Sequence, residues 1–182
     1  HATTEGEIAG AEPAVADLSD IARGVVLQYL PLAHEHNQDL GWVDARAESE
    51  TEDQAPVLPV RANAAELHEA LANLVHNAIK YTPRGGNITV TVRREASHAL
   101  AEVCDSGPGI APERRDSVFE RFHRDPSTHA ATQGAGLGLT IARSYARRNG
   151  GEIELDAADM PESTSGGGLR AILKLPLAAG SS

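Results

Sequence analysis

The chain has 182 residues and a formal net charge of −10 at pH 7; 41% of its residues are hydrophobic but only 3% are aromatic. This length and apolar content suffice for one domain with a core of aliphatic side chains, and they exclude a disordered chain. The acidic balance argues against a general nucleic-acid binder, while the single cysteine, Cys104, excludes an internal disulfide and a cysteine-based zinc site and fits a reducing compartment.

The N-terminal third is predicted to contain a helix and two strands. Residues 1–16 are small, polar and weakly patterned, so we expect a loose lead, and the start at His1 without a methionine suggests a piece of a longer protein. Apolar residues at helical spacing predict a helix over about 18–30, which Pro31 should end or kink. Strands are expected within 40–46 and 55–61, with the acidic stretch Glu48–Asp53 as a solvated hairpin loop between them.

A second helix carries two asparagines. The sequence NAAE at Asn63–Glu66 is typical of a capping box that begins a helix. At about 100° per residue, Asn73, Asn77 and Lys80 fall on one stripe beside the apolar face. The residues expected on that apolar face are Leu67, Leu71, Leu74, Ala78 and Ile79.

The second half of the chain is predicted to add four strands and two helices. Residues 83–86 (PRGG) end the asparagine helix, 87–95 alternate as a strand with one wet side, and 99–105 form its neighbour. A short helix opened by Pro112 and a mobile loop over 125–133 follow. A glycine-rich start at 134 leads into a helix that Gly150-Gly151 stops, and 152–155 pairs with 169–175. This order predicts an α+β fold with helices on one face of a mixed sheet.

The stripe of Asn73, Asn77 and Lys80 has two interpretations. It could be a polar helix edge, or it could bind a metal and phosphate. Amide oxygens are hard ligands, and Mg²⁺ accepts oxygen donors while keeping waters and substrate phosphates in its shell. Lys80, one turn further on, would supply positive charge for phosphate oxygens.

Two glycine motifs are weak signals when each is taken alone. In DSGPGI (105–110), Asp105 could accept a hydrogen bond from an exocyclic amino group while Gly107 and Gly109 let a flat ring approach the backbone, or the motif could be a tight turn. GAGLGL (134–139) feeds a helix, an arrangement that suits phosphate. It is neither a Rossmann fingerprint, because the βαβ unit is missing, nor a Walker loop, because no Gly-Lys-Ser/Thr follows.

Taken together and in order, these motifs resemble the ATP-binding boxes of sensor histidine kinase catalytic domains, in the superfamily of DNA gyrase, Hsp90, histidine kinases and MutL. NLVHNAIKYTP (73–83) resembles the N box, DSGPGI the first glycine box, FERFHR (119–124) the F box, GAGLGLTIA (134–142) the second glycine box and SGGGLRAILKLPL (165–177) a weaker third one. The resemblance covers about residues 16–177. It implies a two-layer α/β sandwich of the Bergerat type, with a mixed, mostly antiparallel sheet and helices packed on one face. The implied organisation is a lead over 1–16, a catalytic domain over 17–177 with an ATP lid at about 123–135, and a tail over 178–182.

The resemblance also implies a site for ATP and Mg²⁺. Asn77 would be the principal metal ligand, Asn73 would join it or bind phosphate or water, and Asp105 would read the adenine amino group. It places Lys80, Tyr81 and Arg124 near the phosphates or the ribose. The catalytic residues that it implies are Asn73, Lys80 and Arg124. The other implied nucleotide-binding residues are Gly107, Gly109, Ile110, Phe122, Gly134, Ala135, Gly136, Leu137, Gly138 and Leu139.

The identity of Asn73 decides which activity the resemblance implies. Hydrolysing members of the superfamily carry a glutamate at this position as general base, and an amide cannot take the proton. We therefore expect a protein histidine kinase fragment that donates the γ-phosphate to a histidine on an absent dimerisation domain of the same parent chain, with a response regulator downstream. The fragment alone should be monomeric, and the parent an inner-membrane sensor with this domain in the cytoplasm. The alternatives are an ATPase or chaperone-like member of the superfamily, or a degenerate ATP-binding module.

Two positions depart from the family pattern. His123 stands where many members have tyrosine, and Leu169 stands where a threonine often supports adenine through its hydroxyl. The hydroxyl contact must therefore be missing or be supplied elsewhere.

Overall fold

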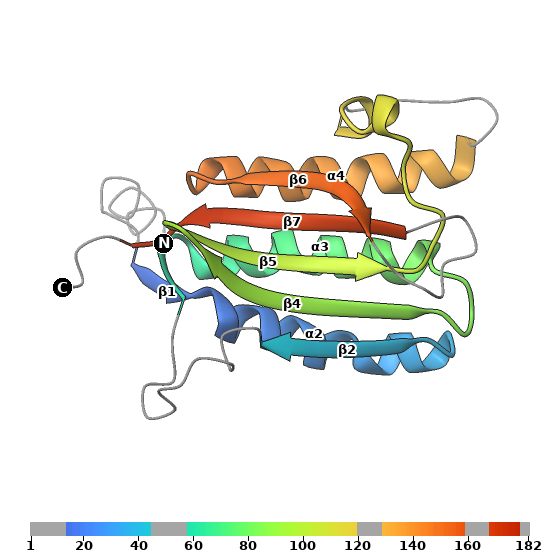
Figure 1. The fold of residues 1–182 in the computed structure, drawn as a ribbon, viewed down its shortest axis with the longest axis horizontal. Helices are drawn as coiled ribbons and strands as arrows, with labels where there is room; N and C mark the ends of the chain where they lie inside the picture. The colour runs from blue at the N-terminus through green and yellow to red at the C-terminus, as the bar shows by residue number, and fades with distance from the viewer. Residues whose placement is uncertain (1–13, 45–57, 120–128, 159–167, 179–182) are drawn as a thin grey trace, which may run out of the picture.

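The computed structural model describes residues 14–44, 58–119, 129–158 and 168–178, in which a five-stranded sheet is covered by helices on one face (Figure 1). Its strands, in spatial order, are β2 (Asp39–Asp44), β4 (Asn87–Glu95), β5 (His98–Asp105), β7 (Gly168–Pro176) and β6 (Glu152–Ala158). Only β2 and β4 run parallel, and the other neighbours are antiparallel. The covering helices are α2 (Leu18–Glu35), α3 (Ala64–Tyr81) and α4 (His129–Arg148). The predicted mixed sheet with helices on one face is confirmed.

The core lies between the sheet and these helices. Ile88, Val90 and Val92 of β4 have no exposed surface, which confirms the alternation predicted for this strand. Among the described residues, no helix is both long and apolar enough to cross a membrane.

Helix α2 is longer than predicted. The side chain of Asp17 caps it by accepting a hydrogen bond from the Ser19 N–H, and the helix continues through Pro31 to Glu35. Pro31 removes the N–H that would bond the Leu27 carbonyl, but Leu27 is 58% exposed, so water can satisfy that oxygen. Of the two predicted effects of Pro31, ending the helix was therefore wrong, and a kink stays a prediction.

The predicted hairpin between the first two strands is also wrong. β2 joins the main sheet, whereas β3 (Pro59–Arg61) pairs with β1 (Val15–Asp17), a strand that we did not predict. The Leu58 N–H donates to the carboxylate of Asp17, so β3 is fixed to the start of α2 instead of to β2. The acidic stretch Glu48–Asp53 lies outside the described residues.

Helix α3 begins as predicted but is held by a residue far away in the sequence. The side chain of Asn63 accepts the Glu66 N–H at 3.0 Å, which confirms the cap. The carboxylate of Glu66 does not complete a capping box, because it binds the side chains of Asn149 and Arg148. The Asn149 side-chain oxygen instead accepts the Asn63 N–H at 2.9 Å. The start of α3 and the end of α4 are thus joined by side chains.

The other end of α3 is held by Gln38. The Gln38 side-chain amide is buried and donates to the carbonyls of Ile79 and Thr82, at 2.9 and 2.8 Å. The last carbonyls of a helix have no partner within the helix, so these two bonds satisfy groups that burial would otherwise leave unpaired. Gln38 thereby fixes the turn that carries Lys80 and Tyr81.

The region between β5 and α4 differs from the prediction in two ways. Where we expected one short helix, the structure has two 3₁₀ turns, Pro112–Arg114 and Ser117–Phe119. Residues 129–133, part of the predicted mobile loop, form the start of α4, consistent with the good helix formers alanine and glutamine there. Residues 125–128 lie outside the described residues. The helix therefore starts before Gly134 and not at the glycine box.

Candidate functional site

The two asparagine side chains of α3 point to the same place on α4. A Cβ atom built on Gly138 would lie 3.5 Å from Oδ1 of Asn73 and 4.0 Å from Oδ1 of Asn77. The orientation of Asn73 is fixed, because its Nδ2 donates to the carbonyl of Glu69 at 2.8 Å. Both amide oxygens therefore face the seam between α3 and α4, as the predicted stripe required, and glycine at position 138 leaves room beside them.

Within the described ranges, neither a cluster of metal-binding side chains nor a reactive cysteine competes with this pair. The described residues contain no group of three or more His, Cys, Asp or Glu side chains that could hold a metal ion. Burial, followed by the charge of Glu102, raises the pKa of the Cys104 thiol to about 11, which keeps the thiol protonated at neutral pH. Two neutral oxygen donors with space beside them suit a hard cation that keeps water and phosphate ligands, so these residues fit Mg²⁺.

The last turn of α3 brings the asparagine helix against the first glycine box. Lys80 is exposed, and its ammonium nitrogen lies 5.8 Å from the centre of the Tyr81 ring. A Cβ atom on Gly107 would lie 2.8 Å from the carbonyl oxygen of Tyr81, so only glycine allows this approach. The N box and the first glycine box are therefore in direct backbone contact.

Asp105 is a buried carboxylate, and one of its oxygens is hydrogen-bonded to the main chain. It is 5% exposed, and its Oδ1 accepts the N–H groups of Gly107 at 2.9 Å and Leu169 at 3.3 Å. Desolvation by burial raises its pKa from 3.8 to about 6, although the two backbone hydrogen bonds lower it. At neutral pH the group is therefore charged and held in a fixed orientation.

The third glycine motif supports Asp105 through its backbone. Leu169, whose side chain has no hydroxyl, supplies its N–H to the Asp105 carboxylate. Gly168 lies so close to Asp105 that a Cβ atom there would collide with the Asp105 carbonyl. Gly109 adopts φ +75°, a conformation that favours glycine, and lies against Gly168. The main chain at the start of β7, at Gly168 and Leu169, thus contacts Asp105 and fixes its position.

The raised pKa of Asp105 predicts a dependence of stability on pH. Between pH 4 and 6 the folded state binds more protons at this carboxyl than the unfolded state, so its contribution to the free energy of unfolding falls as the pH rises. The total loss is about 3 kcal/mol at about 1.4 kcal/mol per pKa unit. Asp105→Asn removes this titration, and urea unfolding should show the variant more stable than the wild type at pH 7 but equally stable near pH 4. A difference that stays constant with pH would contradict the assignment.

The remaining predicted site residues fall into three groups. Phe122 and Arg124 lie outside the described residues, as does His123. Gly134, Ala135, Gly136 and Leu137 lie within helical backbone of α4. Leu139 is fully buried in the core, and Ile110 packs against the core.

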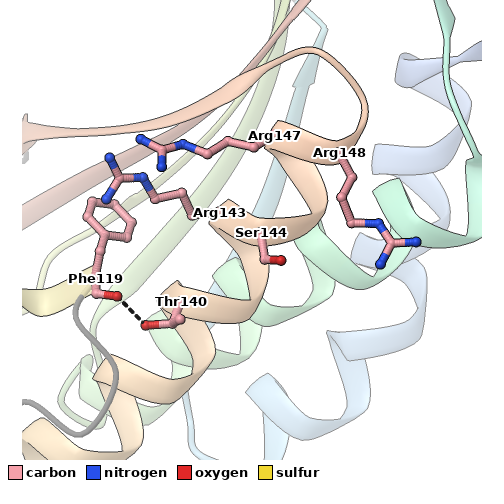
Figure 2. A pocket seen from close by; sticks show the side chains of 6 residues that line it. All are labelled: Phe119, Thr140, Arg143, Ser144, Arg147 and Arg148. Carbon is pink, nitrogen blue, oxygen red and sulfur yellow. Dashed lines mark hydrogen bonds between the residues drawn. The ribbon is translucent and has the colours of Figure 1, made fainter.

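Sequence reasoning missed the contacts that join the F box to α4. The hydroxyl of Thr140 donates to the carbonyl of Phe119 at 2.7 Å, and the guanidinium of Arg143 lies 4.4 Å from the centre of the Phe119 ring (Figure 2). In the sequence, Thr140 and Arg143 are ordinary helix positions, and only the proximity of a second element reveals their contacts.

Residues 62–179 match the family described as histidine kinase-, DNA gyrase B-, and HSP90-like ATPase. The chain belongs to this ATPase family. The signal transduction histidine-protein kinase/phosphatase MprB of Mycobacterium ulcerans (strain Agy99) is 37% identical over 148 residues, which are 78% of this chain and 29% of that protein. The sensor-like histidine kinase SenX3 of Mycobacterium tuberculosis (strain CDC 1551 / Oshkosh) is 43% identical over 111 residues, 60% of this chain and 27% of SenX3.

Solved structures of histidine kinases share the fold over nearly the whole chain. A nucleotide-free catalytic domain of histidine kinase ThkA is 26% identical, with a TM-score of 0.69 over 90% of this chain and 97% of that chain. ThkA has also been solved in complex with response regulator protein TrrA, at 25% identity, a TM-score of 0.67, and coverage of 91% of this chain and 42% of that chain. The resemblance to histidine kinase catalytic domains is thus confirmed, although the chain spans less than a third of the length of MprB and SenX3.

Proposed function

We propose that this chain binds ATP with Mg²⁺ and donates the γ-phosphate to a histidine on a separate dimerisation domain of its parent protein. The observation that carries the proposal is the convergence of the Asn73 and Asn77 oxygens on Gly138. The names of the relatives, which are sensor histidine kinases, support it. By the same likeness, we propose a response regulator as the downstream partner, and a parent that is an inner-membrane sensor with this domain in the cytoplasm.

Each described residue has a distinct part in this proposal. Asn77 and Asn73 would hold Mg²⁺ through their amide oxygens, and the ion when bound would supply positive charge to the transferred phosphoryl group. Asp105 has one oxygen occupied by two backbone N–H groups, so its other oxygen can accept a hydrogen bond from the adenine amino group. Lys80 is exposed beside this site and can place its charge near phosphate oxygens.

Asn73 favours transfer to histidine over hydrolysis. A water molecule that attacks the γ-phosphate needs a base, and the amide of Asn73 is too weakly basic to accept its proton. Phosphoryl transfer depends mainly on positioning and charge stabilisation, so the nucleophile that reaches the site determines the product. A histidine brought by another domain would be that nucleophile.

The test is to incubate the chain with γ-labelled ATP, alone and with the dimerisation domain of the parent protein. We expect slow release of phosphate by the chain alone and acid-labile, base-stable phosphohistidine in the mixture. Rapid multiple-turnover hydrolysis by the chain alone would favour the ATPase alternative. Nucleotide binding with neither product would favour a degenerate ATP-binding module.

A further inference from the structure

A hollow of about 480 Å³ lies on the flank of α4 (Figure 2). Its lining residues are Phe119, Thr140, Arg143, Ser144, Arg147 and Arg148. Arg147 lies about 180° around the helix from Gly138, because nine residues separate them at about 100° each. Since Gly138 faces the two asparagines, the hollow lies on the side of α4 away from the candidate nucleotide site.

Two arginines of the hollow are held in place by one carboxylate. Nε of Arg143 donates to Oε2 of Glu152 at 3.0 Å, and Nε of Arg147 donates to Oε1 at 2.9 Å. Arg143 is further fixed by its position over the Phe119 ring. In the described part of the chain, Glu152 is the only acidic partner of these two guanidinium groups, so two positive charges share one negative charge. Their side chains are 28% and 54% exposed, which leaves them open to a ligand.

Arg143 and Arg147 converge on the carboxylate of Glu152, and the other donors of the hollow lie apart from them. Arg143 and Arg147 extend to one side of α4, whereas Arg148 extends toward α3, where it binds Glu66, and Ser144 lies between them (Figure 2). The point on which Arg143 and Arg147 converge is occupied by the Glu152 carboxylate, which a single phosphate group would have to displace. A nucleic acid is disfavoured by the net charge of −10. Residues four apart on a helix have Cβ atoms about 5–6 Å apart, so Arg143 and Arg147 match carboxylates with a similar spacing.

We propose that this hollow docks an acidic segment of a partner protein, with carboxylates about one helical turn apart set against Arg143 and Arg147. The Phe119 ring and the hydroxyl of Ser144 would give the segment an apolar and a polar contact beside the charges. The proposal is independent of the nucleotide site, because its residues lie on the other flank of α4.

The full chain can be tested with a fluorescent, end-capped peptide that carries glutamates at positions i and i+4, and with the same peptide carrying glutamines. Fluorescence anisotropy at low salt should show binding of the glutamate peptide only, and about 0.5 M salt should abolish it. Arg143→Gln/Arg147→Gln should weaken binding about fivefold, since two exposed charge pairs are lost. Glu152→Gln should strengthen it, because the competing carboxylate is removed.

Matched variants control for the change in net charge. Arg23→Gln/Arg94→Gln alters two exposed arginines elsewhere, and Glu35→Gln alters an exposed acid at the end of α2. These controls should leave peptide affinity unchanged, and all the variants should keep the affinity for Mg-ATP. Three results would each overturn the proposal. The wild type could fail to bind the glutamate peptide below about 1 mM, it could bind the glutamine peptide equally well, or Glu152→Gln could fail to strengthen binding. Stronger competition by inorganic phosphate or an oligonucleotide than by the peptide would also overturn it.

Discussion

Asn77→Ala is expected to lower Mg²⁺-dependent affinity for ATP at least about a hundredfold while the chain stays folded. The substitution removes one of the two amide oxygens that face the seam between α3 and α4 at Gly138. Losing a residue that only supports a metal ligand lowers metal affinity about ten- to hundredfold, and losing the ligand itself should cost at least as much. Isothermal titration calorimetry with Mg-ATP would measure the effect.

Two measurements separate a metal ligand from a structural residue. ADP binding in EDTA should be nearly the same in the wild type and the Asn77→Ala variant, because no metal takes part. His76→Ala, at an exposed position next to Asn77 in α3, should leave both affinities unchanged. Unchanged Mg-ATP affinity in Asn77→Ala would show that Asn77 is only a polar residue of the helix.

Asp105→Asn is expected to reverse the preference for ATP over GTP. The asparagine oxygen can still accept the N–H groups of Gly107 and Leu169, so the amide nitrogen takes the place of the free carboxylate oxygen. A donor then faces the adenine amino group, which is also a donor, while the carbonyl of guanine becomes a suitable partner. A charged hydrogen bond is worth about 1.5–3 kcal/mol, so ATP affinity should fall about ten- to hundredfold.

Competition between labelled ATP and unlabelled GTP would show this change directly. Asp105→Ala serves as the control, since it removes the acceptor without adding a donor and should weaken ATP without improving GTP. If Asp105→Asn weakens both nucleotides equally, Asp105 maintains only the turn of the first glycine box.

The parts of the fold that could be predicted are those that local patterns determine. The alternation in residues 87–95 reflects a strand with one buried face, and Asn63 before an apolar helical pattern reflects a cap whose partner is only three residues away. The single stripe of Asn73 and Asn77 follows from helical geometry alone, so the shared direction of their side chains was predictable.

Contacts between distant segments could not be predicted in this way. Asn149 ends a helix in the sequence, but nothing local indicates that it binds the Asn63 N–H, 86 positions earlier. The bond from the Leu169 N–H to Asp105 uses the main chain, which every residue except proline offers, so the side chain at 169 gives no sign of it. Gly138 was predicted only as a nucleotide-binding residue of the second glycine box. Its position against the asparagine oxygens depends on the packing of α3 on α4.

Errors arose where tertiary structure overrides a local preference. Pro31 disfavours a helix, yet the carbonyl it leaves unpaired belongs to the exposed residue Leu27, so the helix continues. The hairpin prediction failed because Leu58 bonds to Asp17 and directs β3 toward β1.

The two hydrogen bonds from the Gln38 amide to the end of α3 affect the choice of a minimal fragment of this protein. The family match begins at residue 62, yet the donor for the buried carbonyls of Ile79 and Thr82 lies before that boundary. A fragment trimmed to 62–179 would lose this donor, the edge strand β2 and the side chains of α2 that complete the core. The residues matched by the family, 62–179, therefore leave out segments that complete the core of this domain. We expect that an expression fragment should start before Val15.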